Sequence, residues 1–228
     1  MSVVSRNVTL MDGIEISPLA FDARYELPSH LRGACRKDLH RIVMQGFGDG
    51  VLSAQSPRAD ARCLFRVSGQ TLLVRYRADL VHQIPGLRAE PVPLLPTLDG
   101  VEYWISAEVS PTIARSQRGA LPDAVKQQFN PRGRRVPVPS HEISDWLADF
   151  LARKGLQART IRHGPRTNVR RTSERTGVIP ALEFQAAVVG GEALNRALAL
   201  GLGRGLTYGQ GLIVIEDPAA RGGGHPKE

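Results

Sequence analysis

The sequence has few cysteines, no clustered histidines and no long apolar run, and each shortage excludes a class of protein. Its two cysteines, Cys35 and Cys63, form no CxxC pair, so we expect buried thiols rather than a disulfide or a metal site. The six histidines lack the spacing of metal ligands, and we expect no bound metal or other cofactor. No apolar run approaches the roughly 20 residues of a membrane span, and the N-terminal residues contain no apolar signal core, so we expect a cytoplasmic protein.

Positive charge is concentrated in two segments of the chain. The sequence has 30 Lys and Arg residues against 22 Asp and Glu residues, a net charge of +8. Eight basic residues and one acidic residue lie between Arg153 and Arg175, and six basic residues and one acidic residue lie between Pro111 and Arg135. The rest of the chain is mildly acidic. Such a distribution is typical of a protein that binds a polyanion.

The pattern of apolar and breaker residues predicts two similar halves. For the first half we expect a strand at residues 3–10, a helix at residues 29–45, strands at residues 61–67 and 72–76, and a short weak segment at residues 79–87. Ser29 is the expected N-cap of the helix. The run of Pro91, Pro93 and Pro96 is interpreted as a linker between domains.

The second half repeats this arrangement. We expect strands at residues 101–109, 156–161, 178–189 and 212–215 and helices at residues 140–155 and 192–200. Residues 111–139 are expected to form one long basic loop. Each half approximates the β-α-β-β-α-β order of a ferredoxin-like unit. The predicted fold class is α+β, with two tandem ferredoxin-like (RRM-like) domains at residues 1–96 and 97–217, a C-terminal glycine-rich loop and a disordered tail at residues 218–228.

The glycine-rich segment from Gly201 to Gly211 reads GLGRGLTYGQG and follows an expected helix. Dinucleotide-binding loops run from strand to helix instead, and here Leu206 stands where their third glycine would be. Several glycines allow the backbone to approach something large closely, and Arg204 suggests an anionic partner. The alternative is a flexible helix cap with extra glycines.

His40 lies on the first expected helix. The centre of that helix's apolar stripe is roughly 140° away from His40. We therefore expect His40 to face outward, close to Lys37 and Arg41, and the alternative is an ordinary solvated face. His30 is a weaker candidate because it stands at the start of the helix.

Several stretches together resemble the CRISPR-associated repeat-processing endoribonucleases, in the CasE branch that supplies the cleavage subunit of type I-E Cascade. The most specific is AVVGGEALNRALALGLGRGLTYGQGLIVI, which is similar to the family's helix, glycine loop and last strand. RCLFRV, YWISAEVSPT and RRVPV before a Trp-containing helix follow the family's order. The resemblance extends from about Val3 to Val214.

This resemblance implies a metal-independent endoribonuclease. It would bind the CRISPR repeat hairpin in precursor crRNA and cut at the base of the stem, leaving a 2′,3′-cyclic phosphate and a 5′-hydroxyl. It would then stay bound to the mature crRNA beside other Cascade subunits. The alternative is a non-catalytic RNA-binding subunit of the same fold. A third possibility, RRM-type RNA binding, is disfavoured because the paired aromatic residues of an RNP motif are missing.

The family places a histidine on its first helix, and DLHRIV supplies His40 at that place. A neutral imidazole can transfer a proton near pH 7. The family often has a tyrosine three residues earlier, where this chain has Lys37. Either Lys37 stabilises the transition state, or Tyr25 or another group does the work of the tyrosine.

The resemblance also implies a set of RNA-binding residues. In the family, a hairpin that corresponds to TIRHGPRTNVRRTSERTG grips the RNA stem, and arginine suits this role because its fork binds two phosphate oxygens. The predicted RNA-binding residues are Arg36, Arg41, Arg159, Arg162, Arg166, Arg170, Arg171, Arg175, Gly203 and Arg204. The alternative for the hairpin is a solvated basic loop. The loop from Arg115 to Arg135 is either a second contact or simply mobile.

Overall fold

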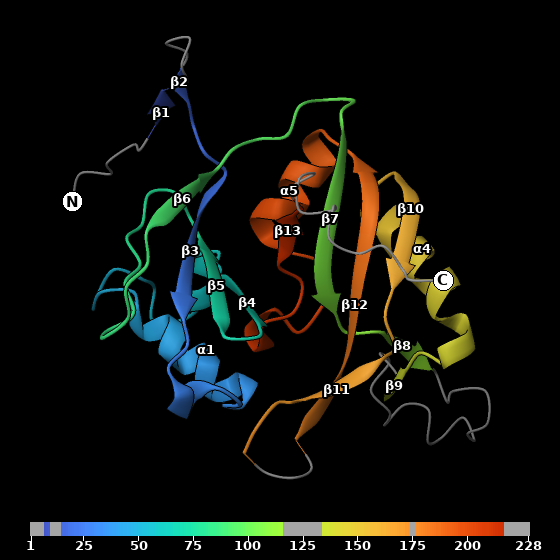
Figure 1. Cartoon of the computed structure of the whole chain (residues 1–228), viewed down its shortest axis with the longest axis horizontal. Helices are drawn as coiled ribbons and strands as arrows, with labels where there is room; N and C mark the ends of the chain where they lie inside the picture. Colours follow the sequence, from blue (N-terminus) through green and yellow to red (C-terminus); the bar gives the residue numbers. More distant parts are fainter. Residues whose placement is uncertain (1–6, 10–14, 116–133, 174–176, 217–228) are drawn as a thin grey trace, which may run out of the picture.

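The computed structural model describes residues 7–9, 15–115, 134–173 and 177–216. They form two larger antiparallel sheets, two separate two-stranded pairs and several helices (Figure 1). This mixture confirms the predicted α+β class. The first sheet has the order β4-β5-β3-β6, and its strands are β3 (Ala20–Glu26), β4 (Leu64–Ser68), β5 (Thr71–Tyr76) and β6 (Pro91–Leu94). Side chains alternate along β3, where Ala23 and Tyr25 are buried while Arg24 and Glu26 are exposed, as a strand with one covered face requires.

The second sheet has the order β10-β12-β7-β13. When the strands of each sheet are counted along the chain and β11 is left aside, both sheets have the order 2-3-1-4. Its strands are β7 (Glu102–Val109), β10 (Ala158–His163), β12 (Val178–Val189) and β13 (Ile213–Ile215). Helix α4 (Ile143–Ala152) precedes β10, and helix α5 (Glu192–Leu200) precedes β13. The second half therefore has the β-α-β-β-α-β order that the sequence predicts.

Strand β12 is long enough to pair with two strands on the same side. Residues Phe184–Val188 pair with β10, whereas Val178–Ala181 pair with β11 (Thr167–Arg170). The part that carries β11 extends beyond the main sheet and reaches toward the first half (Figure 1). Up to Arg170, the basic segment thus contains two successive strands, β10 and β11, that both pair with β12.

The first half lacks the second helix of the predicted unit. The weak segment at residues 79–87 forms no helix, and it is an irregular connection in which Leu80 and Ile84 are buried in the core. The Pro-rich run is also more than a linker, because Pro91–Leu94 form β6 and pair with β3. Proline fits there because β6 is an edge strand, where a missing N–H group breaks no ladder.

The predicted first helix is divided. Ser29–Leu31 form a short 3-10 helix, η1, and helix α1 begins only at Arg36 and ends at Gln45. Between them, Gly33 has a φ of +91°, a backbone conformation that interrupts a right-handed helix. Ser29 therefore does not cap α1, whose N-cap is Cys35.

Three further differences lie at the edges of the fold. The first strand of the main sheet is β3, whereas the expected N-terminal strand is represented by β1 (Val8–Thr9), which pairs with β2 (Glu15–Ile16). A short helix, α2 (Pro57–Asp60), precedes β4. The ends of the long basic loop form a hairpin of β8 (Thr112–Arg115) and β9 (Arg134–Pro137), and residues 116–133 between them lie outside the described residues.

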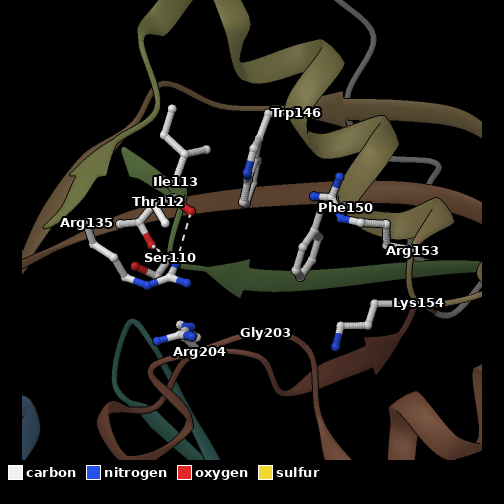
Figure 2. Close-up of a pocket in the computed structure, with 11 residues that line it drawn as sticks. Ser110, Thr112, Ile113, Arg135, Trp146, Phe150, Arg153, Lys154, Gly203 and Arg204 are labelled. Atoms are coloured by element: carbon white, nitrogen blue, oxygen red, sulfur yellow. Dashed lines mark hydrogen bonds between the residues drawn. The ribbon is translucent and has the colours of Figure 1, made fainter. Parts of the chain in front are cut away.

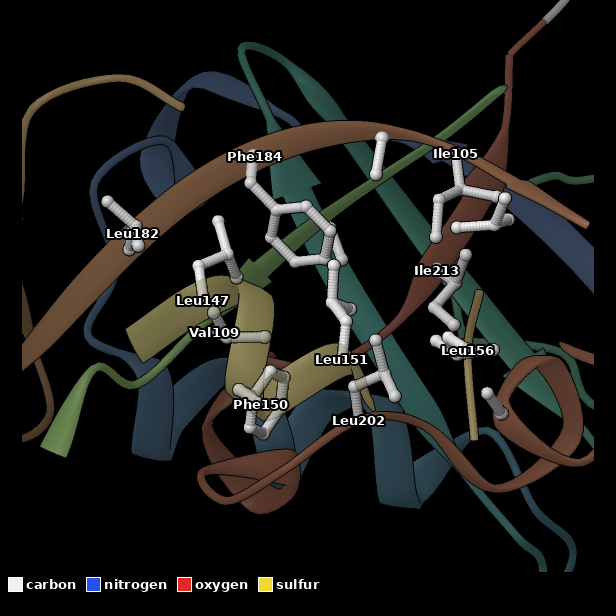
Figure 3. Packing of buried hydrophobic residues seen from close by; sticks show 14 of the residues in the cluster. Ile105, Val109, Leu147, Phe150, Leu151, Leu156, Leu182, Phe184, Leu202 and Ile213 are labelled. Carbon is white, nitrogen blue, oxygen red and sulfur yellow. The ribbon is translucent and has the colours of Figure 1, made fainter. Parts of the chain in front are cut away.

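Each half has its own apolar core. In the second half, Leu147 and Leu151 of α4 pack against the sheet residues Val109 and Phe184 (Figure 3). The first half has a separate cluster that includes Tyr25 and Leu39. A small third cluster of Leu64, Leu73 and Leu212 joins the halves, because the first two residues belong to the first sheet and Leu212 precedes β13.

The division at residues 96 and 97 falls between β6 and β7, and the division of the chain into two domains with these bounds stays a prediction. Within the described part of the chain, no helix is both long and apolar enough to cross a membrane. The predicted tail at residues 218–228 lies outside the described residues.

Candidate nucleic-acid interface

Helix α1 lies against the glycine-rich loop where the two halves meet. The loop contains a short 3-10 turn, η4 (Leu206–Tyr208), flanked by Gly205 and Gly209 with φ values of +79° and +74°. A Cβ atom on Gly209 would stand 2.6 Å from the Phe65 ring and 3.0 Å from Nη1 of Arg36. The sequence correctly predicts a close backbone approach, but at Gly209 the approaching group is the first half of this chain rather than an anion.

Arg36 fastens α1 to the second sheet. Its Nη2 atom lies 3.2 Å and 3.0 Å from the two carboxylate oxygens of Glu108 in β7, and the two residues are only 8% and 5% exposed. Burial raises the pKa of Glu108, and the charge of Arg36 opposes that rise. Burial and the pairing of Nη2 with Glu108 therefore argue against the predicted RNA-binding role of Arg36.

His40 is half-buried rather than turned fully outward. Its ring lies 6.3 Å from the Phe65 ring, centroid to centroid, and its Nε2 atom is buried without a hydrogen-bond partner among the described residues. The helix periodicity correctly places His40 away from the apolar stripe. It gives no information about β4, which contributes Phe65 on that side.

Two causes lower the pKa of His40 below its ordinary value. Burial disfavours the charged imidazolium, and the nearby positive charge of Arg58 in α2 acts in the same direction. Arg58 is itself held in place, because its Nη1 donates a hydrogen bond to the carbonyl oxygen of Cys63 at 3.1 Å. His40 is therefore neutral at pH 7, which is the form that accepts a proton.

The end of β11 and the residue that follows it, Arg171, lie at the start of α1. The backbone N–H of Lys37 donates to the carbonyl oxygen of Arg171 at 2.9 Å, and Nη2 of Arg170 donates to the carbonyl oxygen of Gly33 at 2.7 Å. The Arg171 guanidinium lies 5.3 Å from the centre of the Tyr208 ring in the glycine-rich loop. The structure thus brings Arg170 and Arg171 to the start of the helix that carries both Lys37 and His40.

Tyr25 does not belong to this group. It is 1% exposed in the core of the first half, and its hydroxyl lies 2.8 Å from Nδ1 of His82 and 3.2 Å from the His82 carbonyl oxygen. Burial raises the pKa of Tyr25. A buried hydroxyl that is already paired with His82 is a structural group, and we remove Tyr25 from the catalytic candidates.

The other predicted arginines are spread over the surface. Arg159 is paired with Glu102 at 3.6 Å, and the Arg162 guanidinium lies 5.4 Å from the centre of the Trp104 ring. Both residues are in β10, which pairs with the end of β12 far from β11 (Figure 1). Arg41 is exposed and paired with Asp38.

Arg166 comes between β10 and β11, and it donates a hydrogen bond to the carbonyl oxygen of Val138. Arg175 lies outside the described residues. Gly203 and Arg204 line a separate pocket on the other side of the glycine-rich loop, beside α4 and the β8–β9 hairpin (Figure 2).

Both cysteines are buried and free, as expected. Burial raises the pKa of the Cys63 thiol to about 12, so this side chain is not a nucleophile at neutral pH. Among the described residues, no group of three or more His, Cys, Asp or Glu side chains is arranged to hold a metal ion.

Sequence reasoning missed Arg58 and Phe65, which set the environment of His40. They belong to a different part of the chain, and no spacing rule connects them to α1. Tyr208 was visible as an aromatic residue within the glycine-rich loop, but its partner Arg171 follows only from the fold.

Comparison with known proteins gives one family and one fold. The model of a family described as CRISPR associated protein matches residues 14–217. No curated protein matches the sequence closely enough to count as a relative.

Several solved structures are similar to this chain, among them the following three. The CRISPR endoribonuclease Cse3 bound to a 19-nucleotide RNA is 16% identical with a TM-score of 0.63, and the match covers 87% of this chain and 99% of Cse3. Cas6e from Escherichia coli K-12 is 15% identical, with a TM-score of 0.61 and coverage of 86% and 98%. A chain of a CRISPR RNA-guided surveillance complex is 20% identical, with a TM-score of 0.56 and the same coverage. These likenesses confirm the tandem ferredoxin-like fold.

Proposed function

The chain belongs to the CRISPR associated protein family, and we therefore propose that it binds the hairpin of a CRISPR repeat in precursor crRNA and cleaves it at the base of the stem. Nearly the whole length of the endoribonuclease Cse3, in its RNA-bound form, matches this chain. The match to a chain of an RNA-guided surveillance complex supports a second part of the proposal. After cleavage, the protein keeps the mature crRNA and remains a subunit of Cascade.

The observation that carries the proposal is the position of His40. A neutral, half-buried imidazole lies on the helix that also carries Lys37 and whose start lies beside Arg170 and Arg171. Unpaired polar atoms such as its Nε2 are uncommon in protein interiors and need an explanation. A role in proton transfer supplies one, and it requires that RNA binding expose the atom, because Nε2 is closed to solvent in the free protein.

We propose that His40 acts as the general base. It takes the proton of the RNA 2′-hydroxyl, whose oxygen attacks the adjacent phosphorus and forms the 2′,3′-cyclic phosphate. The bond from phosphorus to the 5′-oxygen breaks, and that oxygen takes a proton from water and leaves as the 5′-hydroxyl. No oxidant, reductant or metal ion is needed in this balance.

The cations around α1 suit the charge that develops on the phosphorane. Lys37 stands in the first turn of the helix, and Arg58 is close enough to His40 to affect its pKa. Fixed positive groups stabilise such a transition state without reorganising during the reaction. Of the two possibilities for the missing tyrosine, the structure supports Lys37, because Tyr25 is buried.

The end of the β10–β11 segment is the proposed grip on the RNA stem. Arg170 and Arg171 are exposed, and contacts with Gly33 and Tyr208 hold their guanidinium groups beside α1. A-form RNA presents its phosphates along a deep, narrow major groove, so arginines at this position read the shape and charge of the stem. A solvated loop would not need such contacts.

The alternative is a structural RNA-binding subunit without catalytic activity. The observation that favours it is Lys37, which replaces the tyrosine of the resembled family. This alternative has the same RNA contacts, but His40 has no chemical role in it.

Product analysis on a repeat hairpin tests the proposal. We expect cleavage to persist in excess EDTA and to give a 2′,3′-cyclic phosphate and a 5′-hydroxyl. A single 2′-deoxy substitution at the cut site should abolish it. Binding without cleavage would support the alternative, and activity that EDTA removes and magnesium restores would indicate a different nuclease chemistry.

A further inference from the structure

A pocket of about 550 Å³ lies across the glycine-rich loop from α1, between α4, the β8–β9 hairpin and the loop itself (Figure 2). It is lined by two aromatic residues and four cationic residues, Trp146, Phe150, Arg135, Arg153, Lys154 and Arg204. None of these residues takes part in the chemistry proposed for His40. The combination of rings and positive charge indicates a ligand that is flat and anionic.

The aromatic wall is built by one face of α4. Trp146 and Phe150 are one helical turn apart, and their rings are stacked at 5.1 Å between centroids with an interplanar angle of 11°. Phe150 is 9% exposed and packs under Gly203, where a Cβ atom would stand 3.0 Å from the ring. Trp146 is only half-buried, so part of its indole remains available in the pocket (Figure 2).

The cations face this wall without sufficient negative charge to neutralise them. Neither Arg135, Arg204 nor Lys154 has a carboxylate partner within the described part of the chain, and Arg153 has only an exposed contact of 4.0 Å with Asp149. Burial and the charge of Arg204 both lower the pKa of Arg135. An anion bound between Arg135 and Arg204 would relieve this repulsion.

We propose that the pocket binds one unpaired nucleotide of RNA, from a single-stranded segment next to the hairpin. Its base stacks on Trp146, and its phosphate lies between Arg135 and Arg204. Bases in a duplex are already stacked, so an aromatic wall of this kind selects unpaired nucleotides. This inference rests on the proposed function, because it assigns the pocket to the same RNA.

The glycine-rich loop connects the pocket to the hairpin interface. Arg204 lines the pocket, and Tyr208, four residues later, supports Arg171. Four residues of extended chain span at most about 14 Å, so the two sites are close enough for one continuous RNA strand. Stacking tolerates any base, and the pocket therefore adds affinity without adding a strict sequence requirement.

The test compares the affinities of a blunt repeat hairpin and of hairpins with a short single-stranded 5′ or 3′ flank. For the wild-type protein, we expect one flank to strengthen binding by about 5- to 150-fold, the range for stacking of one base. The double variant Arg135→Ala/Arg204→Ala and the variant Trp146→Leu should bring the flanked-to-blunt ratio close to one. Arg88→Ala, which removes an exposed charge in the connection before β6, is the control and should keep the wild-type ratio.

The outcomes separate the pocket from the proposed function. A wild-type protein that gains nothing from either flank, or variants that retain the full gain, would overturn the pocket proposal. Trp146 packs on the core, whereas the double arginine variant leaves the core intact. The arginine variant therefore remains informative if Trp146→Leu is unfolded. If the wild type binds no hairpin, the proposed function fails. Single-stranded RNA alone then tests the pocket, and loss of its binding in the arginine variant would support the nucleotide site.

Discussion

Burial, to which the Phe65 ring contributes, and the charge of Arg58 both lower the pKa of His40. The ring of Phe65 removes water from one side of the imidazole, and the guanidinium of Arg58 repels an added proton. Both effects favour the neutral base. A histidine on a fully solvated helix face would instead be partly protonated just below pH 7.

Replacing His40 by Ala should lower the cleavage rate by about 10²- to 10⁴-fold, the usual contribution of general acid–base catalysis. Affinity for the hairpin should change little, because no positive charge is lost at pH 7. Single-turnover cleavage and equilibrium binding measure the two quantities. His30→Ala is the matched control, since His30 is exposed in η1 ahead of the helix. Equal rates for the His40 variant and the wild type would refute the catalytic assignment.

The second residue-level prediction concerns pH. A general base must be neutral, so the wild-type rate should fall on the acidic side only below pH 6.5, the ordinary pKa of histidine, because the pKa of His40 is lowered. Arg58→Gln removes a repelling charge and should raise the pKa of His40. The acidic limb of the pH–rate profile should then move to higher pH.

Arg88→Gln is the control for the Arg58 variant and should leave the acidic limb in place. An unchanged midpoint in Arg58→Gln would show that Arg58 does not act on the proton-transferring group. A large loss of rate at every pH would instead indicate that Arg58 contacts the phosphate directly.

Among the elements, the contact between β11 and α1 links the proposed grip to the proposed base. Backbone hydrogen bonding from Lys37 to Arg171 fixes the end of the basic segment against the first turn of the helix. An RNA stem held by this segment is therefore positioned relative to His40 by a short and ordered path.

Replacing Arg170 and Arg171 together by Ala should weaken hairpin binding and flatten its salt dependence. Each lost phosphate contact reduces the slope of log K against log salt by about 0.7 to 0.9. Cleavage at saturating RNA should survive. The measurement is a binding titration at several salt concentrations. Wild-type affinity at every concentration would mean that the segment is a solvated loop.

Two variants serve as controls for this element. Tyr208→Leu keeps both charges and removes only the ring below Arg171, so it separates loss of charge from loss of position. Arg88→Ala/Arg196→Ala removes the same number of exposed arginines elsewhere and should leave the salt slope unchanged.

The elements that the sequence predicts well are those with a clear period. Strand β12 and helix α5 lie close to the expected positions because their apolar residues repeat with the spacing of their structure. Helix α1 was extended too far because its apolar pattern continues across Gly33, and only the backbone conformation marks the break. Strand β6 was hidden by its prolines.

The candidate site was predicted in part, and for a similar reason. His40, Lys37, Arg170 and Arg171 come from the resemblance and from charge, and their roles stay predictions, although the fold places them around the start of α1. The pairing of Arg36 was missed because its partner, Glu108, is distant in the sequence, and Arg58 was missed for the same reason. Contacts between residues that are far apart in the chain leave no repeating pattern in a single sequence, so they could not be predicted from it.

At the scale of the whole molecule, the buried pair of Arg36 and Glu108 holds the halves in register. Glu108→Gln removes one charge and leaves the other buried, so unfolding stability should fall by about 3–5 kcal/mol. Urea unfolding measures this change. The double variant Arg36→Met/Glu108→Leu removes both charges and should regain much of the loss, whereas equal destabilisation by both variants would show that shape rather than charge matters.

Strand β12 has a mechanical consequence. It is 12 residues long, about 40 Å when extended, and it is bonded to β7 over much of its length while β11 is bonded to its far end. A pull on an RNA held by β11 is therefore transmitted as shear along a row of backbone hydrogen bonds in the central sheet. Many bonds resist such a load at the same time, whereas a flexible loop would yield at its weakest contact. If β11 holds the RNA as proposed, the fold would therefore resist the removal of that RNA by a pulling force.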